Sequence, residues 1–334
     1  MKFSYVVGNP PFQTSNSDNS NQAKPLYNYF VEEAKKICEN DIVMITPSRW
    51  FSGGIGLDSF RENMLKENKI RRIQEFANGK ECFPSTSISG GVSFFVWDKD
   101  YDGPCEFTNI SNGDEQTMTR YLNEYPILVR DNMGVNIIRK VKALNEESLS
   151  SKVSAISPFA LSTKVWGKEH REEGMLRLYS SKGISYIESK EVDSNNIYTN
   201  KYKAMVSQTG AEHAGEPAKD GTFRVLTSSM QVLQPGDVCT HSYILIGPYD
   251  TQIEPTNIIK YLKTKFVRYL VLQAVASIHI SRTTFLFVPV QNFSDSSKID
   301  WSQEISEINK QLYKKYNLNK EEIEYIEKKI KEMV

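Results

Sequence analysis

The chain has 334 residues, 41 basic and 41 acidic side chains, and a formal net charge of zero. This balance excludes a globally basic, histone-like binder, although a local basic face would still suffice for phosphate contacts. A hydrophobic content of 39% is ordinary for a globular protein of two domains. Because the sequence contains no apolar run near the roughly 20 residues that cross a bilayer, and no secretory signal, we expect a cytoplasmic protein without membrane contact.

The first part of the chain alternates strand and helix patterns. Apolar runs of strand length lie at 3–8, 42–46, 70–76 and 92–97. Helical periodicity follows the first two runs, and in the earlier helix it places Leu26, Phe30, Ala34 and Ile37 on one face. This alternation predicts an α/β sheet with helices on its faces.

A polar, serine-rich stretch at 145–157 predicts a domain boundary, so we expect a first domain at 1–145 and a second at 151–334. The second domain changes to short strands with turns and then to helices, which predicts a mixed α+β fold. Its later elements are a helix opened by Pro255 and running to Leu270, a strand at 285–290 and two charged helices at about 302–316 and 320–332.

Cysteine and histidine spacing predicts no metal site. No two cysteines form a Cys-x-x-Cys pair, and no histidine stands at ligand spacing from them. We therefore expect buried, reduced thiols at Cys38, Cys82, Cys105 and Cys239.

The segment Asn9-Pro10-Pro11-Phe12 directly follows the first strand. The two prolines fix φ and remove two backbone donors, which leaves carbonyl oxygens available as acceptors. The Asn9 side-chain oxygen and the Pro10 carbonyl could accept both hydrogens of an exocyclic amino group, while Phe12 stacks on the planar base. Such a site activates the amino nitrogen by positioning and electrostatics, without a strong general base. A rigid turn without function is the alternative.

The segment VVGNPPF is similar to the catalytic motif of amino-methyltransferases. In order along the chain, MITPSRWFSGG, CFPSTSISGGVSFFVWDKD, VRDN, SPFALSTK, YLKTKFVRYL, FVPVQNF and LYKKYNLNKEEIEYIEKKI also resemble the adenine-N6 class of type II restriction–modification enzymes. The resemblance implies a partial Rossmann-like methyltransferase sheet followed by a target-recognition domain. It also implies S-adenosylmethionine as cofactor and double-stranded DNA as partner.

The same resemblance implies that the target base is swung out of the duplex. Phe12 would stack on this flipped base, and Phe83 matches a second aromatic residue that faces it. Core packing beside a turn is the alternative for Phe83.

The family's glycine-rich Phe-x-Gly-x-Gly loop, which binds the cofactor, has no room before Asn9. The cofactor-binding residues therefore stay unassigned. The segment Phe51–Gly56 looks similar but follows the catalytic motif, and a glycine-rich loop alone is a weak signal. On this reading the first strand is an open sheet edge, and we expect a complementary chain to carry the cofactor-binding half.

Basic residues of the second domain are candidates for DNA contact. Phosphates would be bound by cations, and base edges by Ser, Thr, Gln and Arg. Solvation of an amphipathic helix is the alternative for each lysine. The candidates are Lys260, Lys263, Lys265, Arg268 and Arg282.

The sequence thus predicts a site-specific DNA adenine-N6 methyltransferase of a restriction–modification system, incomplete without a partner. A catalytically inactive DNA-specificity subunit or remnant is the alternative. Cytosine-N4 remains open as the target atom.

Overall fold

The computed structural model describes residues 1–14, 24–54, 56–86, 88, 90–111, 113–210, 218, 220–275 and 279–333. In its described residues the chain divides into two compact units, the first formed by residues 1–136 with 218, 220 and 221, and the second by residues 137–210 and 222–333. Along the sequence the division falls within helix α4 (Asn132–Lys142), a few residues before the expected boundary. None of the helices in the described residues is long and apolar enough to cross a bilayer.

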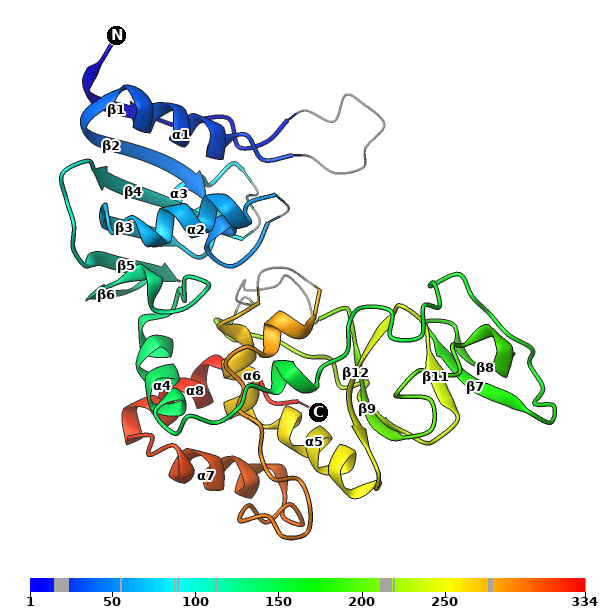
Figure 1. Cartoon of the computed structure of the whole chain (residues 1–334). Helices are drawn as coiled ribbons and strands as arrows, with labels where there is room; N and C mark the ends of the chain where they lie inside the picture. Colours follow the sequence, from blue (N-terminus) through cyan, green and yellow to red (C-terminus); the bar gives the residue numbers. More distant parts are fainter. Residues whose placement is uncertain are drawn as a thin grey trace. The chain divides into compact units, whose positions relative to one another are not determined.

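The first unit is built on one mixed sheet with the strand order β1-β2-β4-β3-β5-β6 (Figure 1). β1 is parallel to β2, and β3 is parallel to β5, whereas β4 runs antiparallel to both of its neighbours. β1, β2, β3 and β5 therefore end at the same edge of the sheet. The strands predicted from the sequence are confirmed, and the bounds are β1 Phe3–Gly8, β2 Cys38–Pro47, β3 Ile70–Phe76, β4 Val92–Asp98, β5 Cys105–Ser111 and β6 Asp114–Arg120.

Helices α1 (Tyr27–Ile37) and α2 (Asp58–Lys66) contribute buried residues to the core of this unit. The predicted inner face of α1 was wrong in part: Ala34 is buried as predicted, but Phe30 and Ile37 are exposed, and Tyr27 and Val31 are buried in their place. The helix carries apolar residues on two sides, so periodicity alone could not select the buried one. Two short helices, η1 (Ser48–Phe51) and α3 (Gly79–Cys82), follow β2 and β3.

Across β1, β2 and β4 the other face of the sheet is apolar, and the described residues cover it only in part. Val7 pairs with Val43, and Val43 with Val96, so the three side chains form a row across β1, β2 and β4. In β1 the alternate residues Phe3, Tyr5 and Val7 are 45%, 65% and 75% exposed. Edge strand β1 thus presents both an apolar face and an edge not paired within the described sheet.

The second unit contains two three-stranded sheets, β10-β9-β12 and β11-β7-β8. Leu178 and Ile187 of one sheet share a buried cluster with Met205 and Leu245 of the other. The bounds are β7 Met175–Ser180, β8 Gly183–Glu188, β9 Tyr202–Ser207, β10 Gln231–Leu233, β11 Asp237–Cys239 and β12 Tyr243–Tyr249.

The helices of the second unit are α5 (Ile253–Lys263), α6 (Lys265–Leu272), α7 (Ile305–Lys315) and α8 (Lys320–Lys329). The single helix predicted after Pro255 is interrupted at Thr264, whose backbone is extended. The Thr264 Oγ1 accepts a hydrogen bond from the Val267 N–H at 3.3 Å and so caps the start of α6. The strand predicted at 285–290 is not formed. Phe285 instead ends a short 3-10 helix, and the residues after it are turn and coil with one isolated bridge from Pro289 to Ser148; Pro289 lacks the N–H that a central strand needs.

Candidate functional site

The Asn9–Phe12 segment leaves β1 at the edge where the parallel strands end. The Asn9 residue is exposed, Pro10 is buried, and Phe12 is half-buried. The Leu26 N–H donates to the Phe12 carbonyl at 3.2 Å, which fixes the segment beside the start of α1. The structure therefore presents Asn9 to solvent on a chain held at both ends.

Phe83 lies at the same edge of the sheet, beyond β3. It directly follows the short helix α3, and its N–H donates to the Gly79 carbonyl at 2.8 Å. Asn78 caps α3 through its side-chain oxygen, which accepts from the Lys80 N–H at 3.1 Å. Phe83 is half-buried. Phe12 and Phe83 thus follow strands that end on one side of the sheet, as a shared base-binding site requires.

The segment Phe51–Gly56 does not fit a cofactor cradle in its described residues, which leave out Ile55. Phe51 is fully buried and packs edge-on against Trp50. The Gly53 N–H donates to the Arg49 carbonyl at 3.1 Å, and a Cβ at Gly54 would clash with Leu57. This segment is occupied by its own packing, so we assign no cofactor-binding residue there.

A buried polar row crosses the sheet at the same edge, and sequence analysis did not identify it. Thr46 pairs with Ser93, Ser93 with Glu75, and Glu75 with Asn109, so residues of β2, β4, β3 and β5 stand side by side. The Glu75 side chain is fully buried, and Asn109 Nδ2 donates to its Oε2. Arg130 Nη1 lies 3.8 Å from Glu75 Oε1. Burial raises the pKa of Glu75, while Arg130, Asn109 and Ser48 act in the opposite direction.

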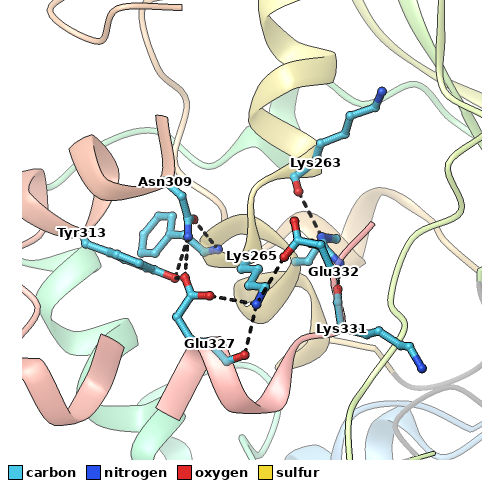
Figure 2. A network of polar contacts seen from close by, with 9 residues as sticks. Lys263, Lys265, Asn309, Tyr313, Glu327, Lys331 and Glu332 are labelled. Atoms are coloured by element: carbon cyan, nitrogen blue, oxygen red, sulfur yellow. Dashed lines mark hydrogen bonds and ion pairs between the residues drawn. The ribbon is translucent and has the colours of Figure 1, made fainter. Parts of the chain in front are cut away.

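The candidate DNA contacts divide into two groups in the structure. Arg268 is only 2% exposed, and its guanidinium donates to the Lys263 and Lys331 carbonyls. Lys265 Nζ lies 2.8 Å from Glu327 and 3.3 Å from Glu332 (Figure 2). These contacts favour a structural role for both cations within the second unit.

Lys260, Lys263 and Arg282 have different surroundings. Lys260 Nζ donates to the Trp301 carbonyl at 2.6 Å, which also ties this cation to its own unit. The Lys263 side chain points away from the polar network in Figure 2. Arg282 is exposed, although its Nε donates to the Val153 carbonyl at 2.9 Å. Of the five candidates, Lys263 and Arg282 are therefore the best placed to meet a phosphate.

The pH dependence of stability should reveal the buried Glu75. Because its folded-state pKa lies above the unfolded value, the stabilisation linked to this group is fully present below the unfolded pKa, near 4.5. It is lost as the pH rises through the folded pKa. Glu75→Gln should remove this decline. Urea unfolding of the wild type and of Glu75→Gln between about pH 4 and 8 measures the free energy of unfolding at each pH. Glu106→Gln on the neighbouring strand is the control. Parallel curves for the wild type and Glu75→Gln would contradict the assignment.

Comparison with known proteins agrees with the motif. Residues 1–83 match the family model of the Eco57I restriction-modification methylase. An uncharacterized adenine-specific methylase of Mycoplasma pneumoniae (strain ATCC 29342 / M129 / Subtype 1) is 37% identical over 106 residues. The alignment covers 31% of this chain and 25% of that relative, so the chain spans about a quarter of it.

Two solved structures resemble most of the chain. The type IIL restriction-modification enzyme MmeI, in complex with DNA, matches with a TM-score of 0.45 and 10% identity over 96% of this chain and 50% of its own. The type IIG restriction endonuclease BpuSI matches with a TM-score of 0.38 and 10% identity, over 91% and 48% of the two chains. Residues 1–83, which carry Asn9–Phe12, are thus similar to the Eco57I family of restriction-modification methylases.

Proposed function

We propose that this chain carries the catalytic loop and the DNA-reading unit of a site-specific DNA adenine-N6 methyltransferase. The observation that carries the proposal is the placement of Asn9–Phe12 at the carboxyl end of β1, inside the segment related to restriction-modification methylases. The exposed Asn9 and the fixed turn after it leave the motif accessible to a base.

The motif would act by holding the amino group of a flipped adenine. The Asn9 side-chain oxygen and the Pro10 carbonyl accept its two hydrogens, which orients the nitrogen lone pair away from the chain. Phe12 stacks on the base, and Phe83 bounds it from the loop beyond β3. S-adenosylmethionine is the methyl donor of the family to which this motif is similar. The described residues supply acceptors and stacking faces for the base, and a complementary part would supply the cofactor site.

Asn9→Ala should abolish most methyl transfer without unfolding the chain. Asn9 is exposed beyond the strand, so alanine removes one acceptor and leaves the core intact. Loss of one positioned, charge-stabilising group costs about a hundred- to a thousandfold in rate. The rate of methyl transfer is measured as methyl incorporation into duplex DNA, with the complementary part supplied in trans. Thermal melting is the control for folding. Near-full activity of Asn9→Ala would show that the motif is not catalytic.

Phe12 offers a matched comparison within the same motif. Phe12→Ala removes stacking worth about 1–3 kcal/mol, so affinity for the flipped base should fall together with turnover. Phe12→Tyr and Phe12→Trp should largely restore both, because a flat π-face is sufficient. Activity absent from every complemented mixture with intact Asn9 would instead favour the inactive DNA-specificity subunit.

The half-covered face of the sheet supports the need for a complementary part. Edge strand β1 has an edge not paired within the described sheet, and its Tyr5 and Val7 side chains are largely exposed. Exposed apolar surface beside a strand edge is typical of a site where further chain packs. We propose that the part with the cofactor site packs against β1 and the row that includes Val43 and Val96.

Tyr5→Lys/Val7→Lys should separate association from folding. Both residues are exposed, so the melting temperature should change little, whereas a charged edge should prevent assembly. With a complementary chain containing a Phe-x-Gly-x-Gly segment, calorimetry should detect S-adenosylmethionine binding for the wild-type mixture but not for the variant. Ile184→Lys, on the exposed face of β8, is the matched control. Tight cofactor binding by this chain alone, or unchanged binding in the variant mixture, would overturn the proposal.

The second unit would read the DNA, with Lys263 and Arg282 near phosphates. Lys263→Ala and Arg282→Ala should each weaken duplex binding and lower the slope of log affinity against log salt by about 0.9. Their melting temperatures should stay close to that of the wild type. Lys265→Ala, two residues after Lys263, is the matched control, because loss of its ion pairs should lower the melting temperature and leave the salt slope unchanged. Salt titrations of duplex binding to the full chain test this assignment. An unchanged slope in both Lys263→Ala and Arg282→Ala would exclude them as phosphate contacts.

A further inference from the structure

The segment Val129-Arg130-Asp131-Asn132 is assigned no role by the proposed function, yet it is tightly fixed to the sheet. The Leu128 N–H donates to the Phe51 carbonyl at 2.7 Å. Asn132 Nδ2 donates to the Phe107 and Gln116 carbonyls, both at 3.0 Å. The backbone on both sides of Arg130 is therefore held, and its guanidinium projects from a fixed base.

The Arg130 guanidinium joins two parts of the sheet edge. Nη2 donates to the Gly90 carbonyl, and Nη1 lies 3.8 Å from Glu75 Oε1. The guanidinium carbon Cζ of Arg130 lies 5.5 Å from the centre of the Phe51 ring. A planar guanidinium can bind a carbonyl and face a carboxylate at once, which the single ammonium of lysine does less well.

The turn at Gly90–Gly91 is packed against the same carboxylate. Both glycines have positive φ, and a Cβ at Gly91 would lie 2.6 Å from the Phe76 carbonyl and 2.9 Å from Glu75 Oε1. The Gly91 carbonyl accepts from the Ser48 N–H at 3.0 Å. The turn thus favours glycine at both positions, and it is held by the Ser48 N–H of η1 and by Arg130.

We infer that Arg130 and Glu75 form a latch that positions the Gly90–Gly91 turn. The turn directly precedes β4 and ends the connection that begins at Phe83, so the latch fixes one end of the segment that bounds the base. Arg130 and Glu75 are positioning residues, since Glu75 is fully buried and the Arg130 guanidinium is engaged by the Gly90 carbonyl and by Glu75. The inference rests on the proposed function for its purpose, but the latch itself exists in the free chain.

Hydrogen–deuterium exchange of the free, full-length chain tests the latch without DNA or cofactor. Arg130→Met should make the amides of Ser48 and the Gly90–Gly91 turn exchange at least about tenfold faster, because the charged donor to the Gly90 carbonyl is lost. The matched control is Arg72→Met, which breaks the exposed 2.8 Å pair between Arg72 of β3 and Glu106 of β5. This control should leave the exchange of the turn unchanged.

A double variant separates local release from general destabilisation. Arg130→Met leaves the buried Glu75 without its cation and should lower the melting temperature. Glu75→Gln/Arg130→Met removes both charges, so most of the melting temperature should return while the turn still exchanges fast. Two results would overturn the latch. One is an unchanged exchange rate of the turn in Arg130→Met. The other is a double variant in which the melting temperature and the exchange rate of the turn both return to the wild-type values.

Methyl incorporation into unmodified genomic DNA then tests the purpose of the latch. In the complemented mixture, the double variant should lose about tenfold to a hundredfold in kcat, the size expected when a binding segment is misplaced by about an ångström. Arg72→Met should keep full activity. Fast exchange combined with full activity would overturn the link to the base site. If the Arg130→Met turn exchanges fast but the wild-type mixture transfers no methyl group, the result would count against the proposed function and would still support the latch.

Discussion

Parallel pairing of β1 with β2 is the constraint that brings the candidate site together. Two parallel strands cannot be joined by a hairpin, so the chain must cross over the sheet, here through α1. The crossover returns β2 in the direction of β1, and both strands end at one edge. β3 and β5 run the same way because antiparallel β4 stands between β2 and β3. Asn9, Ser48, Glu75 and Asn109 therefore reach one edge from distant parts of the sequence, as ligand-binding residues do in open α/β sheets.

The sequence predicted the strands of this sheet because each is a short apolar run between polar segments. It failed where apolar residues did not mark a single face. In α1 both sides are apolar, and Phe30 was placed inward although Val31 is the buried residue. The run at 285–290 is buried as coil, and Pro289 was the available sign that it could not form a central strand. Thr264 was likewise a visible helix start that a continuous apolar pattern concealed.

Site residues that are neighbours in the sequence could be predicted, whereas those brought together only by the fold could not. Asn9–Phe12 is contiguous, and its chemistry can be argued from four neighbouring residues. The Glu75 row and its latch join residues of four strands and of the Arg130 segment, which no spacing in the sequence reveals. The cations of α5 and α6 show the limit most clearly. The sequence pattern does not distinguish Lys263 from Lys265. In the structure Lys265 forms ion pairs with Glu327 and Glu332, which lie more than sixty positions later in the chain.

On the proposed function, the position of Asn9 would depend on what packs against β1. Within the described sheet this strand is paired only with β2, and Asn9 lies two residues beyond the largely exposed Val7. A strand paired on one side is held less firmly than one within a sheet, since its outer backbone groups exchange hydrogen bonds with water. On the proposed function, the complementary part would therefore do more than supply the cofactor site. By packing on β1 it would also stiffen the strand whose end places the Asn9 oxygen, and positioning is the main contribution that this motif makes to catalysis. Association and catalysis would then be coupled through one edge strand, whereas the latch that we infer at Gly90–Gly91 is formed by residues 75, 90, 91 and 130 and would act on the Phe83 segment independently of β1.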